Sequence, residues 1–236
     1  MASSSGNSKP RWLPLEANPE VMNKYVDGLG VGNSFQFCDV FGLDPDLLMM
    51  IPQPCAALVM LFPITDKYEA FRKEEEEKIE KEGQTVSPNV YYMKQYVGNA
   101  CGTIGLLHVL CNNISNLTVR DGYLKKFYEK TKNMTPEERG HFIEEDEEIS
   151  EVHETSAQEG DTAPPSRDEH THLHFVALVQ QDGHIYELDG RKSAPVNHGS
   201  TTPESFLNDA ANVCQKFMTR DPDEIHFTIV ALAAAQ

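Results

Sequence analysis

Apolar and polar positions along the chain follow two periodicities, one typical of strands and one typical of helices. Continuous apolar runs of strand length, and runs in which every second residue is apolar, predict strands where turn-forming residues bound them. The predicted strands cover residues 35–40, 56–62, 174–179, 184–189 and 227–232. Gln181-Asp182-Gly183 separates the third strand from the fourth, and a turn of this kind predicts an antiparallel hairpin.

Helical spacing of apolar residues, together with capping residues, predicts the remaining elements. Asn18-Pro19, Asp44-Pro45 and Thr135-Pro136 each place a capping side chain before a proline, which is favoured at the first helical position. The predicted helices cover residues 19–29, 45–50, 66–82, 101–114, 121–132, 136–149 and 203–217. Because strands and helices are mixed and no internal repeat is present, the sequence predicts one domain built from a sheet and helices.

Two segments lack both patterns. Residues 1–10 are small and polar, which predicts a disordered N-terminus. Residues Ser150–Thr171 contain few apolar side chains but include Gly160 and two prolines, which predicts a mobile loop of about 20 residues. Loops of this length inside a domain are usually functional lids or disordered segments. We expect a lid and no domain boundary, because the strand pattern resumes directly afterwards.

The composition fits a protein with a hydrophobic core, since 39% of the 236 residues are hydrophobic. No apolar stretch reaches the roughly 18 residues of a membrane span, and the first residues lack the apolar run of a signal peptide. We therefore expect a cytoplasmic protein without a membrane partner, with the nucleus as the alternative compartment. Five cysteines are an odd number without a Cys-x-x-Cys pair, which argues against a disulfide framework and against a cysteine-based zinc site.

The charge of the chain is strongly negative, with a formal net charge of −17. Nucleic acid is excluded as a partner, because binding phosphates requires a basic surface. Basic partners are favoured instead. Thirteen acidic residues lie between Glu137 and Glu169, and the only lysine or arginine residues in this segment are Arg139 and Arg167.

The candidate chemistry centres on residues 95–105. A polar turn rich in glycine leads into an apolar helix, and Cys101 lies in the first turn of that helix. There it faces unpaired backbone N–H groups and the positive end of the helix dipole, which both favour the nucleophilic thiolate. Gln95 lies six residues earlier. Its amide and the backbone N–H of Cys101 are candidate donors to an oxyanion.

A cysteine nucleophile needs a histidine base and a group that orients the histidine. The predicted hairpin supplies both groups. If Asp182-Gly183 is a two-residue turn, His174 opposes Arg191, and Asp189 is the diagonal neighbour of His174. If the turn has four residues, His174 opposes Asp189 directly. In either register the imidazole and the carboxylate share one face of the sheet, within reach of a hydrogen bond.

Each candidate also has a purely structural interpretation. A cysteine at a helix start is most often a small buried hydrophobe. Asp189 before Gly190 is also consistent with the end of a strand, and Gln95 by itself is uninformative. An alternating set of histidines is a candidate metal site: His170, His172 and His174. It lacks a carboxylate or cysteine partner at a fitting spacing, so we expect neither a metal nor a cofactor. Structural roles are predicted for His108, Cys111 and His226.

Several runs resemble the ubiquitin carboxyl-terminal hydrolase family, papain-like cysteine proteases that remove ubiquitin from its adducts. The matching runs are residues 11–19, 61–65, 95–105, 153–157, 173–175 and 188–192. The resemblance extends from Arg11 to Ala234 and is closest to the small isozymes that consist of the catalytic domain alone. It implies a catalytic domain over residues 11–236 with a papain-like α+β fold. In that fold a central antiparallel β-sheet is flanked by helices, and the chain is threaded in a knot.

The resemblance also implies the roles of individual residues. Cys101 is the nucleophile, His174 the general base, Asp189 its orienter and Gln95 the oxyanion donor, and all four are present. Residues 150–171 correspond to a crossover loop that limits the size of the leaving group. The residues implied to contact ubiquitin are Pro14, Leu15, Glu16, Ala17, Asn18, Pro19, Ala157, Gln158, Glu159, Gly160, Glu224, Ile225, His226 and Phe227.

The implied function is a monomeric thiol hydrolase whose partner is ubiquitin. It cleaves small adducts or peptide extensions after the C-terminal glycine of ubiquitin, and the resemblance suggests the nearest ubiquitin-like modifier as a second substrate. The acidic charge suits the arginines of the ubiquitin tail. Two alternatives remain at this stage. One is a protein that binds and stabilises ubiquitin with little turnover, and the other is a different thiol enzyme, such as a transferase or an ordinary peptidase.

Overall fold

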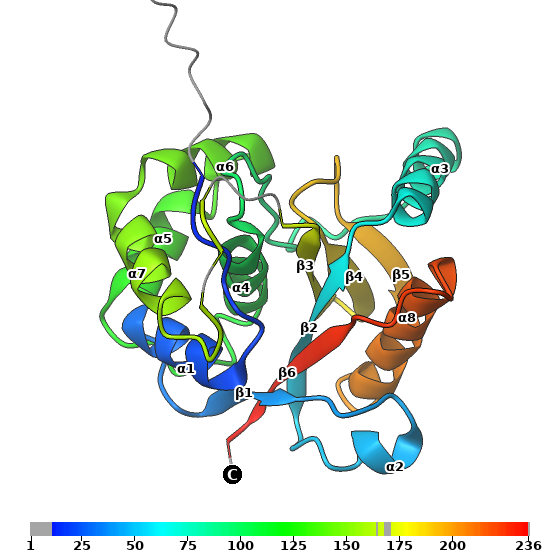
Figure 1. The fold of residues 1–236 in the computed structure, drawn as a ribbon, viewed down its shortest axis with the longest axis horizontal. Helices are drawn as coiled ribbons and strands as arrows, with labels where there is room; N and C mark the ends of the chain where they lie inside the picture. The colour runs from blue at the N-terminus through cyan, green and yellow to red at the C-terminus, as the bar shows by residue number, and fades with distance from the viewer. Residues whose placement is uncertain (1–10, 164, 168–170, 236) are drawn as a thin grey trace, which may run out of the picture.

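A computed structural model, which describes residues 11–163, 165–167 and 171–235, shows a twisted antiparallel sheet with helices on both faces (Figure 1). Within the described residues the sheet has six strands in the order β1-β6-β2-β3-β4-β5. The strands are β1 (Phe35–Asp39), β2 (Cys55–Pro63), β3 (Leu173–Gln181), β4 (His184–Leu188), β5 (Val196–Ser200) and β6 (Thr228–Ala234). Every neighbouring pair is antiparallel. The α+β class and the central antiparallel sheet are therefore confirmed.

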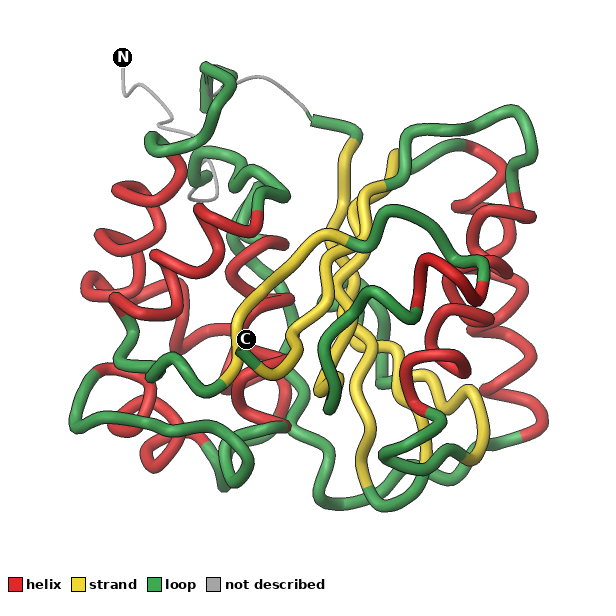
Figure 2. Tube along the Cα trace, turned by 90° about the horizontal axis from the view of Figure 1, so that it is seen from below, coloured by secondary structure: helices red, strands yellow, loops and turns green. Residues whose placement is uncertain are grey.

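The helices form a layer on each side of the strands, as the view from below shows most clearly (Figure 2). One layer holds α1 (Pro19–Gly28), α4 (Cys101–Asn112), α5 (Tyr123–Thr131), α6 (Pro136–Glu145) and α7 (Glu147–Ala157). The other holds α2 (Pro45–Leu48), α3 (Asp66–Glu82) and α8 (Phe206–Arg220). None of the described helices combines the length and the apolar character that crossing a membrane would require.

Two hydrophobic cores lie on the two faces of the sheet because successive side chains of a strand point to opposite faces. In β2, Val59 belongs to the core beneath α4, whereas its neighbours Leu58 and Met60 belong to the core beneath α8. Both faces of β2 are thus buried, which explains its continuous apolar sequence. α4 is buried nearly all round, from Gly102 to Cys111, and packs against β3.

The segment predicted as a mobile lid is partly helical, so the expected boundaries of that loop are wrong. Residues up to Ala157 belong to α7, and only 158–172 form the connection to β3. Asp146 has an extended backbone and caps α7 by accepting a hydrogen bond from the N–H of Ile149. The helix predicted over 136–149 is therefore divided at Asp146 into α6 and α7. α7 buries Ile149, His153 and Ser156. Its buried face is partly polar, and apolar periodicity therefore missed it.

Two further features near the C-terminus differ from what the sequence predicted. α8 begins at Phe206 and not at Pro203, because the N–H of Ser205 donates to the hydroxyl of Thr202 and closes a turn before the helix. β5 was not predicted, since its sequence is largely polar. It is an edge strand beside β4, and Asn197 on it donates to the carbonyl of Thr85. Residues 1–10, predicted to be disordered, lie outside the described part of the chain.

Candidate active site

Cys101 is the first residue of α4, and its side chain is half-buried at the surface of the molecule. The preceding Ala100 makes no side-chain cap, so the N–H groups of the first turn remain directed toward the thiol end of the helix. Gly102 is tightly enclosed, because a Cβ there would lie 2.9 Å from Cβ of Leu15. A side chain at this position would push the N-terminal segment away from the helix.

The imidazole of His174 and the carboxylate of Asp189 form a short, buried hydrogen bond of 2.7 Å between Nε2 and Oδ1. Gln181 pairs with His184, so the hairpin turn has two residues, Asp182 and Gly183, both with positive φ. This is the first of the two registers considered from the sequence, and the predicted contact is confirmed. β4 ends at Leu188, so Asp189 reaches His174 from the turn that follows the strand.

Several donors fix the carboxylate and the backbone of Asp189. The backbone N–H of Arg191 donates to Oδ1 over 2.9 Å, and the hydroxyl of Tyr68 on α3 donates to Oδ2 over 3.3 Å. The hydroxyl of Tyr92 donates to the Asp189 carbonyl over 2.7 Å. With Asp189 fully buried, these contacts leave the carboxylate little freedom to rotate. The side chain of His174 is also hydrogen-bonded to the thiol of Cys101.

The charges of the three groups are coupled. Burial raises the pKa of the Cys101 thiol, but the hydrogen bond and positive charge of His174, with the N–H groups of Phe175 and Gly102, outweigh burial and lower it. Burial lowers the pKa of His174, but Asp189 and Cys101 raise it to about 10. Burial likewise opposes ionisation of Asp189, yet His174 holds the pKa of this carboxyl well below its usual range. The favoured state is a thiolate beside an imidazolium.

Gln95 lies next to the turn that carries Asp189. Its backbone N–H donates to the carbonyl of Gly190 over 2.9 Å, and a Cβ at Gly190 would lie 2.9 Å from Cβ of Gln95. The side-chain nitrogen donates to the carbonyl of Val97 over 3.1 Å, while Oε1 is buried without a partner. One amide N–H is thus already used. The role of Gln95 toward an oxyanion stays a prediction.

A pocket of about 170 Å³ opens beside Cys101. Five residues predicted to contact ubiquitin line it: Pro14, Leu15, Glu16, Ala17 and Ala157. Thr162, Pro165 and Thr171 line it from the segment 150–171, which was expected to lie over the active site. Lining residues that the sequence reasoning missed are Leu61, Asn99, Leu173 and Phe175. Asn99 has a positive φ of 62°, and its position after Gly98 was a signal for such a turn.

The other predicted contact residues lie outside this pocket. Asn18 and Pro19 begin α1, with Asn18 accepting a hydrogen bond from the N–H of Glu20. Gln158 caps the end of α7, and Glu159 forms an ion pair with Lys24. Glu224, Ile225, His226 and Phe227 precede β6, where Ile225 is 79% exposed. His226 bonds to Glu224 over 2.6 Å. Phe227 stacks on Phe62, the strand partner of His174.

Glu16 ties the segment after α7 to the N-terminal segment. Its carboxylate accepts hydrogen bonds from the N–H and hydroxyl of Thr162 and from the N–H of Asp161. Partial burial raises the pKa of Glu16, but the bonds from Thr162, Asn18 and Asp161 outweigh it and lower the pKa. An added Cβ at Gly160 would lie 2.4 Å from Glu16 Oε2. Residues 160–162 are therefore held against the rim of the pocket.

His153 on α7 links the N-terminal segment to α4 and α1 through a buried network that sequence reasoning missed. Burial lowers the pKa of His153, so the ring is neutral at pH 7. Nε2 donates to the carbonyl of Leu13 over 2.6 Å, and Nδ1 accepts from the hydroxyl of Thr103 on α4 over 2.7 Å. Tyr25 on α1 bonds to the same hydroxyl. The N-terminal segment is thereby fixed relative to Cys101.

Two further residues that were singled out from the sequence have structural surroundings. His108 and Cys111 are buried in the core, as predicted. Among the residues that the structure describes, no three His, Cys, Asp or Glu side chains gather in a way that could hold a metal ion. His170, one member of the candidate metal trio, lies outside those residues. His174 is committed to Asp189.

A thiolate at a helix start, an imidazolium and a buried carboxylate on an α+β fold define a cysteine-dependent hydrolase. Residues 12–219 match the family model described as ubiquitin carboxyl-terminal hydrolase, family 1. The chain is 51% identical to a ubiquitin carboxyl-terminal hydrolase of Aplysia californica, covering 92% of this chain and 99% of that one. It is 47% identical to one of Drosophila melanogaster, covering 95% and 98%. The chain belongs to the ubiquitin carboxyl-terminal hydrolase family.

A solved structure has the same fold. The catalytic domain of Trichinella spiralis UCH37, bound to ubiquitin vinyl methyl ester, superimposes with a TM-score of 0.74 at 22% identity. The match covers 95% of this chain and 96% of the other. At this identity the comparison establishes the fold alone, and it confirms a single domain of the α+β class.

Proposed function

We propose that this protein hydrolyses the bond that follows the C-terminal glycine of ubiquitin, with Cys101 as the nucleophile. The observation that carries the proposal is the Cys101–His174–Asp189 arrangement, with its 2.7 Å bond between imidazole and carboxylate, in a member of this family. Neither a metal nor an organic cofactor is needed for this chemistry, because the thiolate and the imidazolium supply both the nucleophile and the acid.

The reaction follows from the charge states of these groups. The Cys101 thiolate attacks the carbonyl carbon, and the backbone N–H of Cys101 and the amide of Gln95 stabilise the oxyanion. The imidazolium of His174 gives its proton to the leaving nitrogen or oxygen, which departs and leaves a thioester. Neutral His174 then takes a proton from water, which attacks the thioester and releases the C-terminal carboxylate. Asp189 keeps the imidazole oriented throughout.

We infer that small adducts and peptide extensions are the preferred leaving groups. The segment 158–172 is pinned by Glu16 at the rim of the pocket, so a bulky leaving group would have to displace it. The fourteen residues predicted to contact ubiquitin form the proposed substrate surface. Five of them line the pocket beside Cys101, which supports the part of the surface closest to the reacting carbonyl.

Further properties belong to the same proposal. We infer that the nearest ubiquitin-like modifier is a second substrate, that the enzyme acts as a monomer in the cytoplasm or nucleus, and that its chain is knotted. The acidic charge of −17 supports attraction of a basic ubiquitin tail. Each of these statements stays a prediction.

Replacing Cys101 with Ala tests the central step. We expect Cys101→Ala to lose measurable hydrolysis of a ubiquitin C-terminal ester, because no thiolate remains, and to bind ubiquitin as the unmodified protein does. Continued turnover by this variant would refute Cys101 as the nucleophile. The alternative of a ubiquitin-binding protein with little turnover is tested with a ubiquitin whose C-terminus carries an electrophile. Failure to label Cys101 would favour that alternative.

A further inference from the structure

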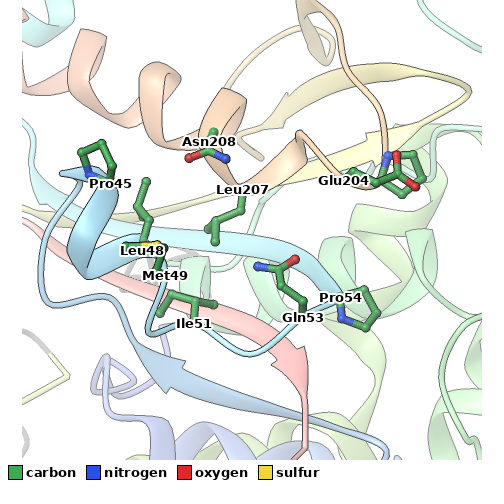
Figure 3. Close-up of a pocket in the computed structure, with 10 residues that line it drawn as sticks. Pro45, Leu48, Met49, Ile51, Gln53, Pro54, Glu204, Leu207 and Asn208 are labelled. Carbon is green, nitrogen blue, oxygen red and sulfur yellow. The ribbon is translucent and has the colours of Figure 1, made fainter.

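A second and larger pocket lies between α2, the loop that follows it and the start of α8 (Figure 3). Its volume is about 590 Å³, compared with about 170 Å³ for the pocket beside Cys101. Leu48 and Ile51 line it from one side and Leu207 from the other, with Pro45 and Pro54 at its edges. We call this pocket the α2–α8 groove. Its largely apolar lining is typical of sites that receive apolar groups.

Met49 of the groove belongs to a stretch of chain with several exposed apolar side chains. Phe41 is 74% exposed, Met49 76% and Met50 61%. Only six large hydrophobic side chains are exposed among the described residues, and these three lie within ten residues of chain. α2 has four residues before the chain turns toward Pro52, so its apolar side chains cannot all face the core. An exposed apolar side chain at the edge of an apolar groove, as Met49 is here, is typical of an interaction site, and flexible methionines suit such surfaces.

The α2–α8 groove is remote from the catalytic residues. Gln53 and Pro54 of the groove directly precede β2, whereas Phe62 near the other end of β2 pairs with His174. β2 has nine residues, so the two sites are roughly 25 Å apart along the strand. A partner in the groove would leave the pocket at Cys101 accessible.

The charges around the groove select among possible occupants. Residues 39–54 and 201–209 contain five acidic side chains and no lysine or arginine: Asp39, Asp44, Asp46, Glu204 and Asp209. Asp44 caps α2, and Asp209 accepts hydrogen bonds from Thr201 and Ser205. Asp46 and Glu204 are exposed. A second copy of this chain placed symmetrically here would set like charges against each other, which is unfavourable.

We propose that the α2–α8 groove docks a separate protein through a short segment that carries large apolar side chains beside lysine or arginine. The apolar side chains enter the groove and cover Met49 and Met50, while the basic residues face Asp46 and Glu204. Residues 1–10 of this chain do not supply such a segment, since they contain one lysine and no large apolar residue after Met1. The proposal does not depend on the hydrolase chemistry.

The test uses a library of randomised peptides displayed on phage and selected against the full chain, with counter-selection on the double variant Met49→Ser/Met50→Ser. Both side chains are exposed, so the variant keeps its fold, which thermal unfolding checks. We expect the enriched peptides to combine large apolar residues with lysine or arginine. A synthetic peptide of the enriched sequence should bind the double variant at least about tenfold more weakly. Ile225→Ser, which removes an equally exposed side chain elsewhere, should bind normally.

Charge reversal completes the test. Asp46→Lys/Glu204→Lys should bind the basic peptide more weakly and gain affinity for a version in which glutamate replaces its basic residues. The proposal is overturned if no sequence is enriched over counter-selection, if acidic sequences are enriched, or if binding survives the double serine variant. A dimer seen by analytical ultracentrifugation and lost in that variant would overturn it in favour of self-association.

Discussion

Asp189 controls the charge state of His174, because its carboxylate lies 2.7 Å from the imidazole and both groups are buried. The thiolate–imidazolium pair exists between the lowered pKa of Cys101 and the pKa of about 10 of His174. Activity should therefore rise as pH passes through the pKa of Cys101 and fall as pH passes through that of His174. The high alkaline limit is a direct consequence of the buried carboxylate.

Asp189→Asn should change both the rate and this pH range. Without the negative charge the pKa of His174 falls, so the alkaline limb of the pH–rate profile moves to lower pH. Loss of the orienting carboxylate should lower kcat by on the order of 10²-fold, with a smaller effect on substrate binding. The profile of kcat/KM against pH, measured with a ubiquitin C-terminal ester, checks this. An unchanged alkaline limb would remove Asp189 from its assigned role.

The alternation of side chains along the predicted hairpin was sufficient to predict that His174 and Asp189 share one face of the sheet, because this alternation is a local property of a strand. The sequence did not predict Tyr68 as a donor to Asp189, since α3 and β4 are brought together only by packing. His153 was missed for the same reason. Its partners Leu13 and Thr103 are 140 and 50 residues away along the chain.

At the scale of elements, the close packing of α4 against the N-terminal segment positions Cys101. Gly102→Ala should disturb it, because the added Cβ would lie 2.9 Å from Cβ of Leu15. We expect a loss of about 1–3 kcal/mol in the free energy of unfolding and a fall in kcat. Gly105→Ala, one turn later, is the matched control. There a Cβ meets Phe175 at 3.7 Å, an ordinary contact, so stability should be unchanged or slightly raised. Equal effects of both substitutions would contradict this account.

The segment after α7 depends on a few hydrogen bonds to Glu16. Glu16→Ala should free residues 158–172, so limited proteolysis there should become faster and larger leaving groups should be cleaved more readily. Global stability should change little, because the contacts are at the surface. Glu20→Ala removes the same charge from an exposed position on α1 and serves as the control. Unchanged proteolysis in the Glu16 variant would show that other contacts hold the segment.

At the scale of the whole molecule, a buried ionic cluster joins α3, β4, β5, α8 and the turn after Asp189. Nζ of Lys192 lies 2.5 Å from carboxylate oxygens of Glu75 and Glu187. Glu187 also bonds to His198 over 2.8 Å, and Arg220 lies 3.7 Å from Glu75. Lys192 and Glu187 are almost fully buried, so neither charge can be left without a partner.

Lys192→Met should lower the free energy of unfolding by about 3 kcal/mol. The substitution removes the lysine charge beside the buried Glu187 carboxylate, which then keeps His198 as its close partner. Chemical denaturation measures this loss. Lys67→Met is the matched control, since Lys67 also bonds to two carboxylates, Asp221 and Asp223, but is exposed to solvent. We expect only a slight change there. A loss no greater for Lys192→Met than for Lys67→Met would mean that the cluster contributes little to stability.

The sequence by itself determined the local features: the central strands, most helices, the position of Cys101 at a helix start and the shared face of His174 and Asp189. These depend on periodicity, capping and turn residues, which act over a few positions. Only the tertiary structure decided the register of the hairpin turn, the polar buried face of α7, the edge strand β5 and the arrangement of Glu16, Lys192 and the α2–α8 groove. Each of these depends on side chains brought together from distant parts of the chain, where burial and hydrogen bonding outweigh local preference.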